Sequence, residues 1–179
     1  MKSLIAYFSR KGDNYVGGRI VNLPIGNTET AAKMIQKLTD GDVFKIATLK
    51  EYPSDYHECT EEARKELRQN ARPELSGRVE RLEDYHVIFL GYPNWWSTMP
   101  MAVYAFLEAY DFSGKIILPF CTHEGSGMGH SESDIKKLCP NAKVLKGLAI
   151  IGGSVQGAEK EIANWIQKVG DSSKDSALR

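Results

Sequence analysis

The sequence predicts an α/β fold in which one parallel sheet of five strands is covered by helices on both faces. The first observation is that five short runs rich in Ile, Val and Phe alternate with helical patterns along the chain. The second is that these runs are apolar at successive positions, which is typical of strands buried on both sides. Such an alternation implies parallel strands joined by right-handed crossovers.

The five strands are predicted from runs of five to nine residues. The first, LIAYF at 4–8, is followed by a polar turn. The remaining runs are DVFKIA at 42–47, HVIFLGY at 86–92, KIILPFC at 115–121 and KVLKGLAII at 143–151. The last run continues without interruption, so we expect a single fifth strand there.

Helices are predicted between and after these strands from apolar residues that recur at helical spacing. Three segments carry this spacing clearly. The segment at 54–70 is mostly charged, which indicates an outer helix facing solvent, and the segment at 131–138 is short and begins with a serine that can cap a helix. The segments are 31–38, 54–70, 100–110, 131–138 and 158–169. The polar end of the chain is expected to fray. We therefore predict one domain over 1–170 and a polar tail over 171–179.

Composition excludes several classes of function. The chain has 23 Lys and Arg residues and 23 Asp and Glu residues, so its formal net charge is zero. This balance argues against nucleic acid or an acidic membrane as a partner. No apolar run approaches the length of a membrane span, and the first residues lead into a strand instead of a signal peptide. The three unpaired cysteines favour a reducing compartment, and we expect the cytoplasm.

Unusual residues cluster where the first, third and fourth strands end. The first loop comprises Ser9, Arg10 and Lys11 together with 26–28, the second loop is 93–98, and the third loop is 122–129. Ligands of open parallel sheets bind beyond the carboxyl ends of the strands, so these loops should meet at one site. The first loop starts a helix and suits an anion such as phosphate. Alternatively, Asn27 or Thr28 only caps that helix.

The residue types in the other two loops suit the binding of a flat aromatic ring. Trp95 and Trp96 are adjacent and cannot both point into one core, so at least one ring should be free to stack on an aromatic ligand. The alternative is that both rings pack under neighbouring loops. The third loop is rich in Gly and Ser, which allows its backbone to approach a ligand. Together the three loops fit a flavin mononucleotide (FMN).

Other chemistries fit the sequence poorly. Cys121 ends a buried strand and is better explained by packing than by nucleophilic catalysis. His123, Glu124 and His130 lack the spacing of a metal site, so no metal is expected. We predict no catalytic side chain.

The chain resembles the flavodoxin-like family, in particular a group of small bacterial flavodoxin-type proteins. The resemblance covers Leu4 to Val169 and rests mainly on DYHVIFLGYPNWWSTMPMAVYAFLE and DFSGKIILPFCTHEGSGMGHSESDIKKLCPNAKVLKGLAI. It implies a three-layer sandwich with strand order 2-1-3-4-5. It also implies that FMN is bound, with the phosphate surrounded by Ser9, Arg10, Asn27 and Thr28. The isoalloxazine ring would be flanked by Pro93, Asn94, Trp95, Trp96, Thr122, His123, Glu124, Gly125, Ser126 and Gly127.

Two departures from that family bear on function. Familiar flavodoxins are strongly acidic, whereas this chain is neutral. The first loop is also split by residues 13–25, whose apolar side chains and Gly17-Gly18 pair suggest a small hairpin or folded loop. This insertion is either a surface elaboration or a flap over the FMN or a substrate.

Three functions remain open from the sequence. The first is electron transfer through bound FMN to a partner protein or a small-molecule acceptor. The second is an FMN oxidoreductase that uses NAD(P)H to reduce a quinone or similar acceptor. The third is an interaction module that has kept the fold but binds little flavin.

Overall fold

Six strands form the parallel sheet of the computed structural model, which describes residues 1–176 and the side chains of residues 1–170. The strands are β1 (Ser3–Tyr7), β4 (Asp42–Lys45), β5 (Val87–Pro93), β6 (Ile116–His123), β7 (Lys143–Val144) and β8 (Leu148–Ile151). Their order is β4-β1-β5-β6-β7, and β8 also pairs with β6. Every pairing in this sheet is parallel, which confirms the predicted order 2-1-3-4-5.

The register of the strands brings their carboxyl ends to one edge. Tyr7 of β1 is opposite Gly91 of β5, and Pro93 of β5 is opposite Thr122 of β6. His123 at the end of β6 is opposite Ile151 at the end of β8. The loops that follow β1, β5 and β6 therefore leave the sheet next to one another.

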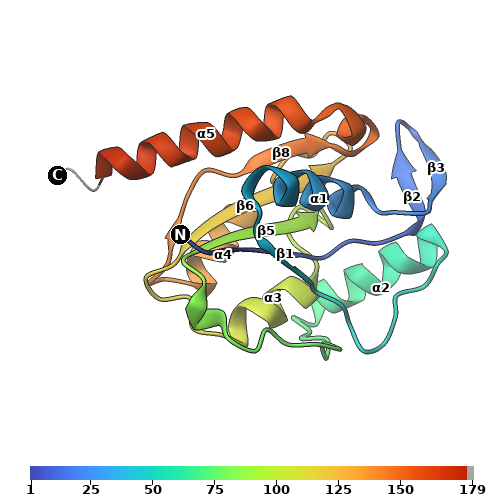
Figure 1. Cartoon of the computed structure of the whole chain (residues 1–179). Coiled ribbons are helices and arrows are strands. Elements are labelled where there is room, and N and C mark those ends of the chain that lie inside the picture. The colour runs from blue at the N-terminus through green and yellow to red at the C-terminus, as the bar shows by residue number, and fades with distance from the viewer. Residues whose placement is uncertain (177–179) are drawn as a thin grey trace.

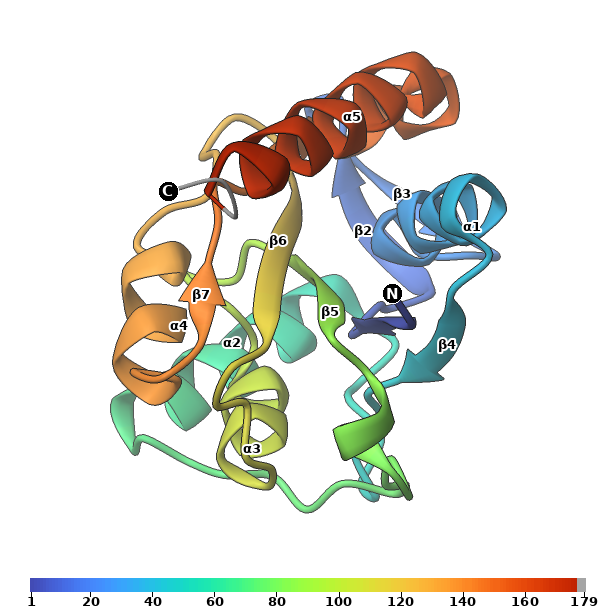
Figure 2. The same cartoon turned by 60° about the vertical axis from the view of Figure 1, so that its left-hand side comes forward.

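Helices cover both faces of the sheet, as Figures 1 and 2 show. One face carries α1 (Asn27–Thr39) and α5 (Glu159–Ser176). The other carries α2 (Tyr56–Arg68), α3 (Met101–Glu108) and α4 (Ser131–Leu138). Alternate residues of β1 point into the two layers: Ile5 packs in the cluster that includes Ile35 of α1, and Leu4 packs in the cluster that includes Phe106 of α3.

A small antiparallel hairpin accounts for the insertion in the first loop. It consists of β2 (Gly12–Val16) and β3 (Arg19–Leu23), and Figure 1 shows it standing apart from the main sheet. Gly17 and Gly18 both have positive φ, 58° and 87°, as a type I′ turn requires. Of the two alternatives predicted for this insertion, a small hairpin or a folded loop, the hairpin is the one that forms.

The predicted fifth strand is interrupted, so the expectation of one continuous strand over 143–151 is wrong. Lys146 and Gly147 do not pair with β6, because side chains form hydrogen bonds with backbone groups of these two residues. The indole N–H of Trp165 donates to the carbonyl of Lys146, and the N–H of Gly147 donates to Glu132. Two short 3-10 helices, η1 (Leu82–Asp84) and η2 (Gly152–Gly157), were also not predicted.

The last helix is longer than predicted. It continues through Ser176, whereas the polar composition suggested fraying from residue 170 onward. The segment contains no proline, and a single glycine at position 170 weakens a helix without ending it. The rest of the predicted tail, 177–179, lies outside the described residues. Within the described chain, no helix has both the length and the apolar character needed to cross a membrane.

Candidate functional site

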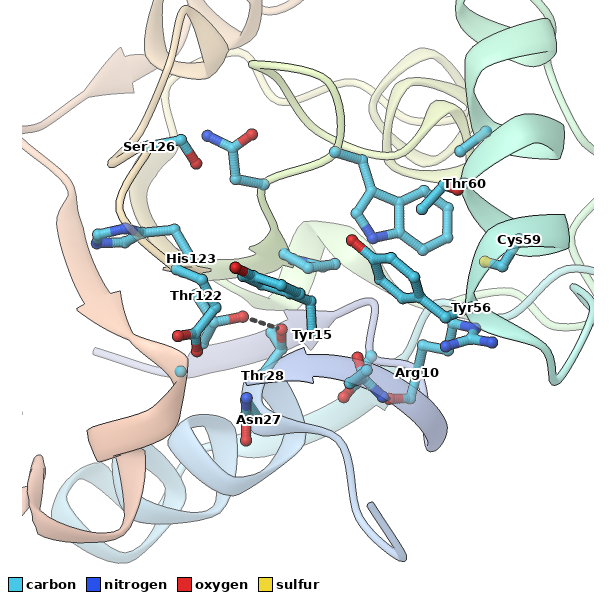
Figure 3. A pocket seen from close by; sticks show the side chains of 18 of the residues that line it. Arg10, Tyr15, Asn27, Thr28, Tyr56, Cys59, Thr60, Thr122, His123 and Ser126 are labelled. Carbon is cyan, nitrogen blue, oxygen red and sulfur yellow. Dashed lines mark hydrogen bonds between the residues drawn. The ribbon is translucent and has the colours of Figure 1, made fainter. Parts of the chain in front are cut away.

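A cavity of about 440 Å³ opens at the carboxyl edge of the sheet, where the three loops meet the hairpin and α2 (Figure 3). All of the residues predicted for the site line this cavity except Gly125 and Gly127. Gly127 still contributes indirectly, because its carbonyl accepts a hydrogen bond of 2.8 Å from the side chain of Asn94. The volume lies in the usual range for small-molecule sites.

The start of α1 forms a cradle for an anion. The hydroxyl oxygen of Ser9 accepts from the N–H of Glu29 at 3.0 Å, so it caps the helix across the hairpin insertion. The first N–H groups of a helix have no acceptor within the helix, and among the described residues those of Asn27 and Thr28 have none elsewhere. These two groups and the helix dipole are therefore available to a phosphate.

Gly26 is required for this cradle to close. A Cβ atom at that position would lie 2.2 Å from the Ser9 hydroxyl oxygen and 2.5 Å from the carbonyl oxygen of Arg10. The absence of a side chain lets the two halves of the first loop approach each other. The donor set and the close packing fit a phosphate group.

Thr28 has a different position from the one expected of a direct phosphate ligand. Its side chain is buried, and its hydroxyl oxygen lies 2.7 Å from that of Thr122. One hydroxyl of this pair donates to the other, so the pair ties the first loop to the third. The backbone N–H of Thr28 remains available to an anion at the helix start.

Arg10 lines the cavity, but its guanidinium is already engaged. It donates to the carbonyl of Asp13 in the hairpin and to the carbonyls of Pro53 and Ser54 at 2.7 Å and 2.6 Å. Arg10 therefore joins the hairpin to the segment before α2. The role beside the phosphate that the resemblance implied would require some of these bonds to be given up.

The two tryptophans of the second loop have different surroundings. The ring of Trp95 makes edge contacts with Phe8 and Tyr52, at centroid distances of 5.2 Å and 5.1 Å, and packs against the core. The ring of Trp96 is 44% exposed at the cavity rim, and its N–H donates to the carbonyl of Thr60 at 3.0 Å. Trp96 is thus the ring that is more accessible to a ligand.

The second loop is held in a strained conformation. Trp96 and Ser97 both have positive φ, 54° and 70°, and Trp95 and Thr98 exchange backbone hydrogen bonds across them. Non-glycine residues adopt this region rarely, and strain of this kind is concentrated at functional sites. Asn94 stabilises the turn, since its side chain accepts from the N–H of Ser97 at 3.0 Å.

The third loop contributes a carboxylate that fastens the hairpin. One oxygen of Glu124 accepts from the N–H of Gly17 at 3.1 Å, and the other accepts from the N–H of Gly153 at 2.7 Å. His123 accepts at Nδ1 from the N–H of Gly125 at 2.9 Å, which leaves its other ring nitrogen to carry the proton in the neutral form.

Several lining residues were not predicted from the sequence. They come from the hairpin, from α2 and from the start of η2: Asn14, Tyr15, Tyr56, Cys59, Thr60, Ala63 and Gly152. The apolar hairpin was a usable signal for Tyr15, whereas α2 was expected to be an outer helix. Burial raises the pKa of the Cys59 thiol to about 11 and that of the Cys121 thiol to about 12, so both are protonated at neutral pH. Neither is prepared as a nucleophile.

Similarity to known proteins agrees with this geometry. A family model described as Flavodoxin matches residues 2–169. No curated protein matches the chain. A structure assigned as a flavoprotein of Bacteroides uniformis ATCC 8492 is 28% identical, with a TM-score of 0.73, over 93% of this chain and 97% of that one. A second structure assigned as a flavoprotein, from Bacteroides eggerthii DSM 20697, is also 28% identical, with a TM-score of 0.69, over 90% of this chain and 98% of that one.

A more distant structure shares the fold. The flavoprotein of Lactobacillus acidophilus NCFM, solved in complex with FMN, is 17% identical to this chain and has a TM-score of 0.62. The match covers 87% of this chain and 97% of that one. Because the family model spans nearly the whole chain and the sheet order is that of the family, the chain belongs to the flavodoxin family.

Proposed function

We propose that this protein binds FMN and exchanges electrons through the bound flavin. The observation that carries the proposal is the cradle at the start of α1, with its free N–H groups, lying in one cavity with an accessible tryptophan. Membership of the flavodoxin family and the FMN complex of the Lactobacillus acidophilus protein support the choice of ligand. When bound, the flavin supplies the capacity to accept and release electrons.

The residues of the chain would divide the binding between them. The N–H groups of Asn27 and Thr28 would hold the phosphate, with the first turn of α1 adding its dipole. Trp96 would offer a flat apolar face to the ring system. The Thr28–Thr122 pair and the Asn94–Gly127 bond hold the three loops at fixed distances, so little reorganisation would be needed on binding.

Titration of the apo-protein with FMN and with riboflavin tests this proposal. Riboflavin has the same ring system but no phosphate, so it isolates the contribution of the cradle. We expect FMN to bind at least tenfold more tightly, a difference of about 1.4 kcal/mol. Equal affinity for the two flavins would mean that the cradle does not hold the phosphate. A protein that binds neither flavin would instead be an interaction module that has kept the fold.

A second candidate function is an FMN-dependent oxidoreductase that uses NAD(P)H. The observation that favours it is the hairpin, which contributes Asn14 and Tyr15 to the wall of the cavity and so leaves less of the cavity open to a large protein partner. Steady-state oxidation of NADH and NADPH by the FMN-loaded protein, with a small quinone as acceptor, distinguishes the two functions. A carrier would show no turnover with either nucleotide alone.

A further inference from the structure

The hairpin is a fixed wall of the cavity because it is attached at both of its ends. At its base, the guanidinium of Arg10 joins the carbonyl of Asp13 to those of Pro53 and Ser54. At its tip, the N–H of Gly17 donates to Glu124, whose other oxygen accepts from Gly153. A two-stranded hairpin alone is marginally stable in water, so these attachments determine its position.

This wall directs one aromatic ring into the cavity. Tyr15 lines the cavity from β2, and its cross-strand neighbour Ile20 does not. Tyr56 lines the same cavity from the first turn of α2. Figure 3 shows the two rings projecting into one space from opposite elements. Their centroids are 6.3 Å apart, and the ring planes differ by only 31°.

The two phenol groups are also unused within the protein. Among the described residues, neither the hydroxyl of Tyr15 nor that of Tyr56 has a hydrogen-bond partner, although both rings lie in a cavity lined by polar groups. Burial raises the pKa of Tyr56, so its hydroxyl stays protonated and can donate at neutral pH. Apolar ring faces combined with free O–H donors suit a flat ring that carries a carbonyl oxygen.

We propose that Tyr15 and Tyr56 form a subsite for a second, planar substrate of the quinone class, next to the cradle and to Trp96. This inference rests on the proposed function, because the electrons come from the reduced flavin. A quinone bound there takes up two electrons and two protons and becomes a hydroquinone. FMN held by the cradle would supply these two electrons and two protons when it is in its reduced form, and it would be left oxidised. A nicotinamide nucleotide, or dithionite in the laboratory, reduces the flavin beforehand.

Binding of menadione, a planar naphthoquinone, to the oxidised FMN-loaded protein tests the subsite. Isothermal titration calorimetry would compare the wild type with Tyr15→Ala, Tyr56→Ala and the matched control Ile20→Ala. Ile20 faces Tyr15 across the hairpin and has nearly the same exposure, 42% against 43%. We expect each tyrosine variant to bind menadione about tenfold more weakly, and Ile20→Ala to bind it within twofold of the wild type. Tyr15→Phe should have an intermediate affinity because it keeps the ring and loses the donor.

A kinetic measurement tests the subsite independently. The dithionite-reduced protein would be reoxidised anaerobically by menadione or by hexacyanoferrate, which has no aromatic ring. The tyrosine variants should lose rate with menadione and keep it with hexacyanoferrate. Equal menadione affinity in the wild type, both tyrosine variants and Ile20→Ala overturns the subsite, as does a wild type that binds FMN but no menadione. Failure of the wild type to bind FMN instead refutes the proposed function itself.

Discussion

At the residue scale, Asn27 offers the most direct test of the cradle. It is the first residue of α1 and lines the cavity beside Ser9. Asn27→Asp keeps the size of the side chain and adds a negative charge where the phosphate would bind. A carboxylate at a helix start is favourable for the helix itself, so unfolding stability should change by less than about 1 kcal/mol. FMN affinity should fall at least tenfold.

Riboflavin provides the control for this variant. Because it lacks the phosphate, its affinity should be the same in the wild type and Asn27→Asp within about twofold. A parallel loss for both flavins would show that the substitution disturbs the ring site instead of the cradle. The measurement is flavin fluorescence quenching on addition of apo-protein.

Substitutions of the two adjacent tryptophans should have different effects on the stability of the fold and on FMN binding. Trp95→Ala removes edge contacts with Phe8 and Tyr52 and should destabilise the fold by about 2 kcal/mol. Trp96→Ala removes an exposed ring and should cost less than about 1 kcal/mol of stability while weakening FMN binding about tenfold. Urea unfolding and FMN titration of both variants check this. The opposite pattern would assign the stacking role to Trp95.

Asp134 should give the protein an acid-sensitive component of stability. Burial alone would raise the pKa of Asp134, but hydrogen bonds from Tyr104, Thr98 and His130 outweigh it and hold that pKa below the ordinary value of 3.8. The folded state therefore favours the ionised form. Its stabilising effect is complete well above pH 4 and is lost as the pH falls through 3.8 and below.

Asp134→Asn should reduce the loss of unfolding stability that accompanies acidification. Urea unfolding at pH 6, 5, 4 and 3 would show a smaller loss of stability on acidification in the variant than in the wild type. The variant should also be less stable at pH 6, because an amide accepts more weakly from the three donors. Parallel profiles would mean that the acid sensitivity arises from other carboxylates.

At the element scale, Glu124 controls the tip of the hairpin. Its two oxygens accept from Gly17 and Gly153, and hydrogen bonds to a charged group are worth about 1.5–3 kcal/mol in protected sites. Because these contacts are exposed, we expect a smaller effect. Glu124→Ala should speed amide hydrogen exchange at Gly17 and Gly153 about tenfold, and Glu124→Gln should have an intermediate effect. Exchange in β5, in the centre of the sheet, should not change.

The elements also show where sequence patterns succeed. The strands β1, β5 and β6 were predicted because each is a continuous apolar run between two helical layers. The hairpin was predicted because Gly17-Gly18 is a turn signal between apolar residues. The break between β7 and β8 could not be predicted, because it depends on Glu132 and Trp165, which are distant in sequence and bind the backbone there.

The candidate site was likewise predicted only in part. The three loops were predicted because parallel strands must end at one edge, and most of the predicted residues do line the cavity. The contributions of Tyr56 and Thr60 were missed, since α2 has a charged sequence and only its tertiary position brings its first turns to the cavity. The engagement of Arg10 with backbone carbonyls was missed for a similar reason. A sequence shows that a guanidinium is present but not which acceptors the fold brings to it.

At the scale of the whole molecule, the balance of charge bears on the proposed electron transfer to a protein partner. With 23 basic and 23 acidic residues, its formal net charge is zero. Association of oppositely charged proteins is accelerated by long-range attraction, which salt screens beyond roughly 8–10 Å. A neutral protein lacks this net attraction. If the protein exchanges electrons as we propose, its transfer to a basic acceptor such as cytochrome c should therefore be slow and should vary less than about twofold between 10 and 200 mM salt.

A charge variant makes this expectation falsifiable. Lys136 and Lys137 lie on α4 beside the third loop, and changing both to Glu lowers the net charge by four while leaving the cavity lining unchanged. If charge limits the encounter, this variant should reduce cytochrome c faster at low salt and lose that advantage at high salt. Menadione is uncharged, so its reduction should be equal in both proteins at every salt concentration. A steep salt dependence in the wild type would instead reveal a local charged surface that directs a protein partner to the flavin despite the hairpin.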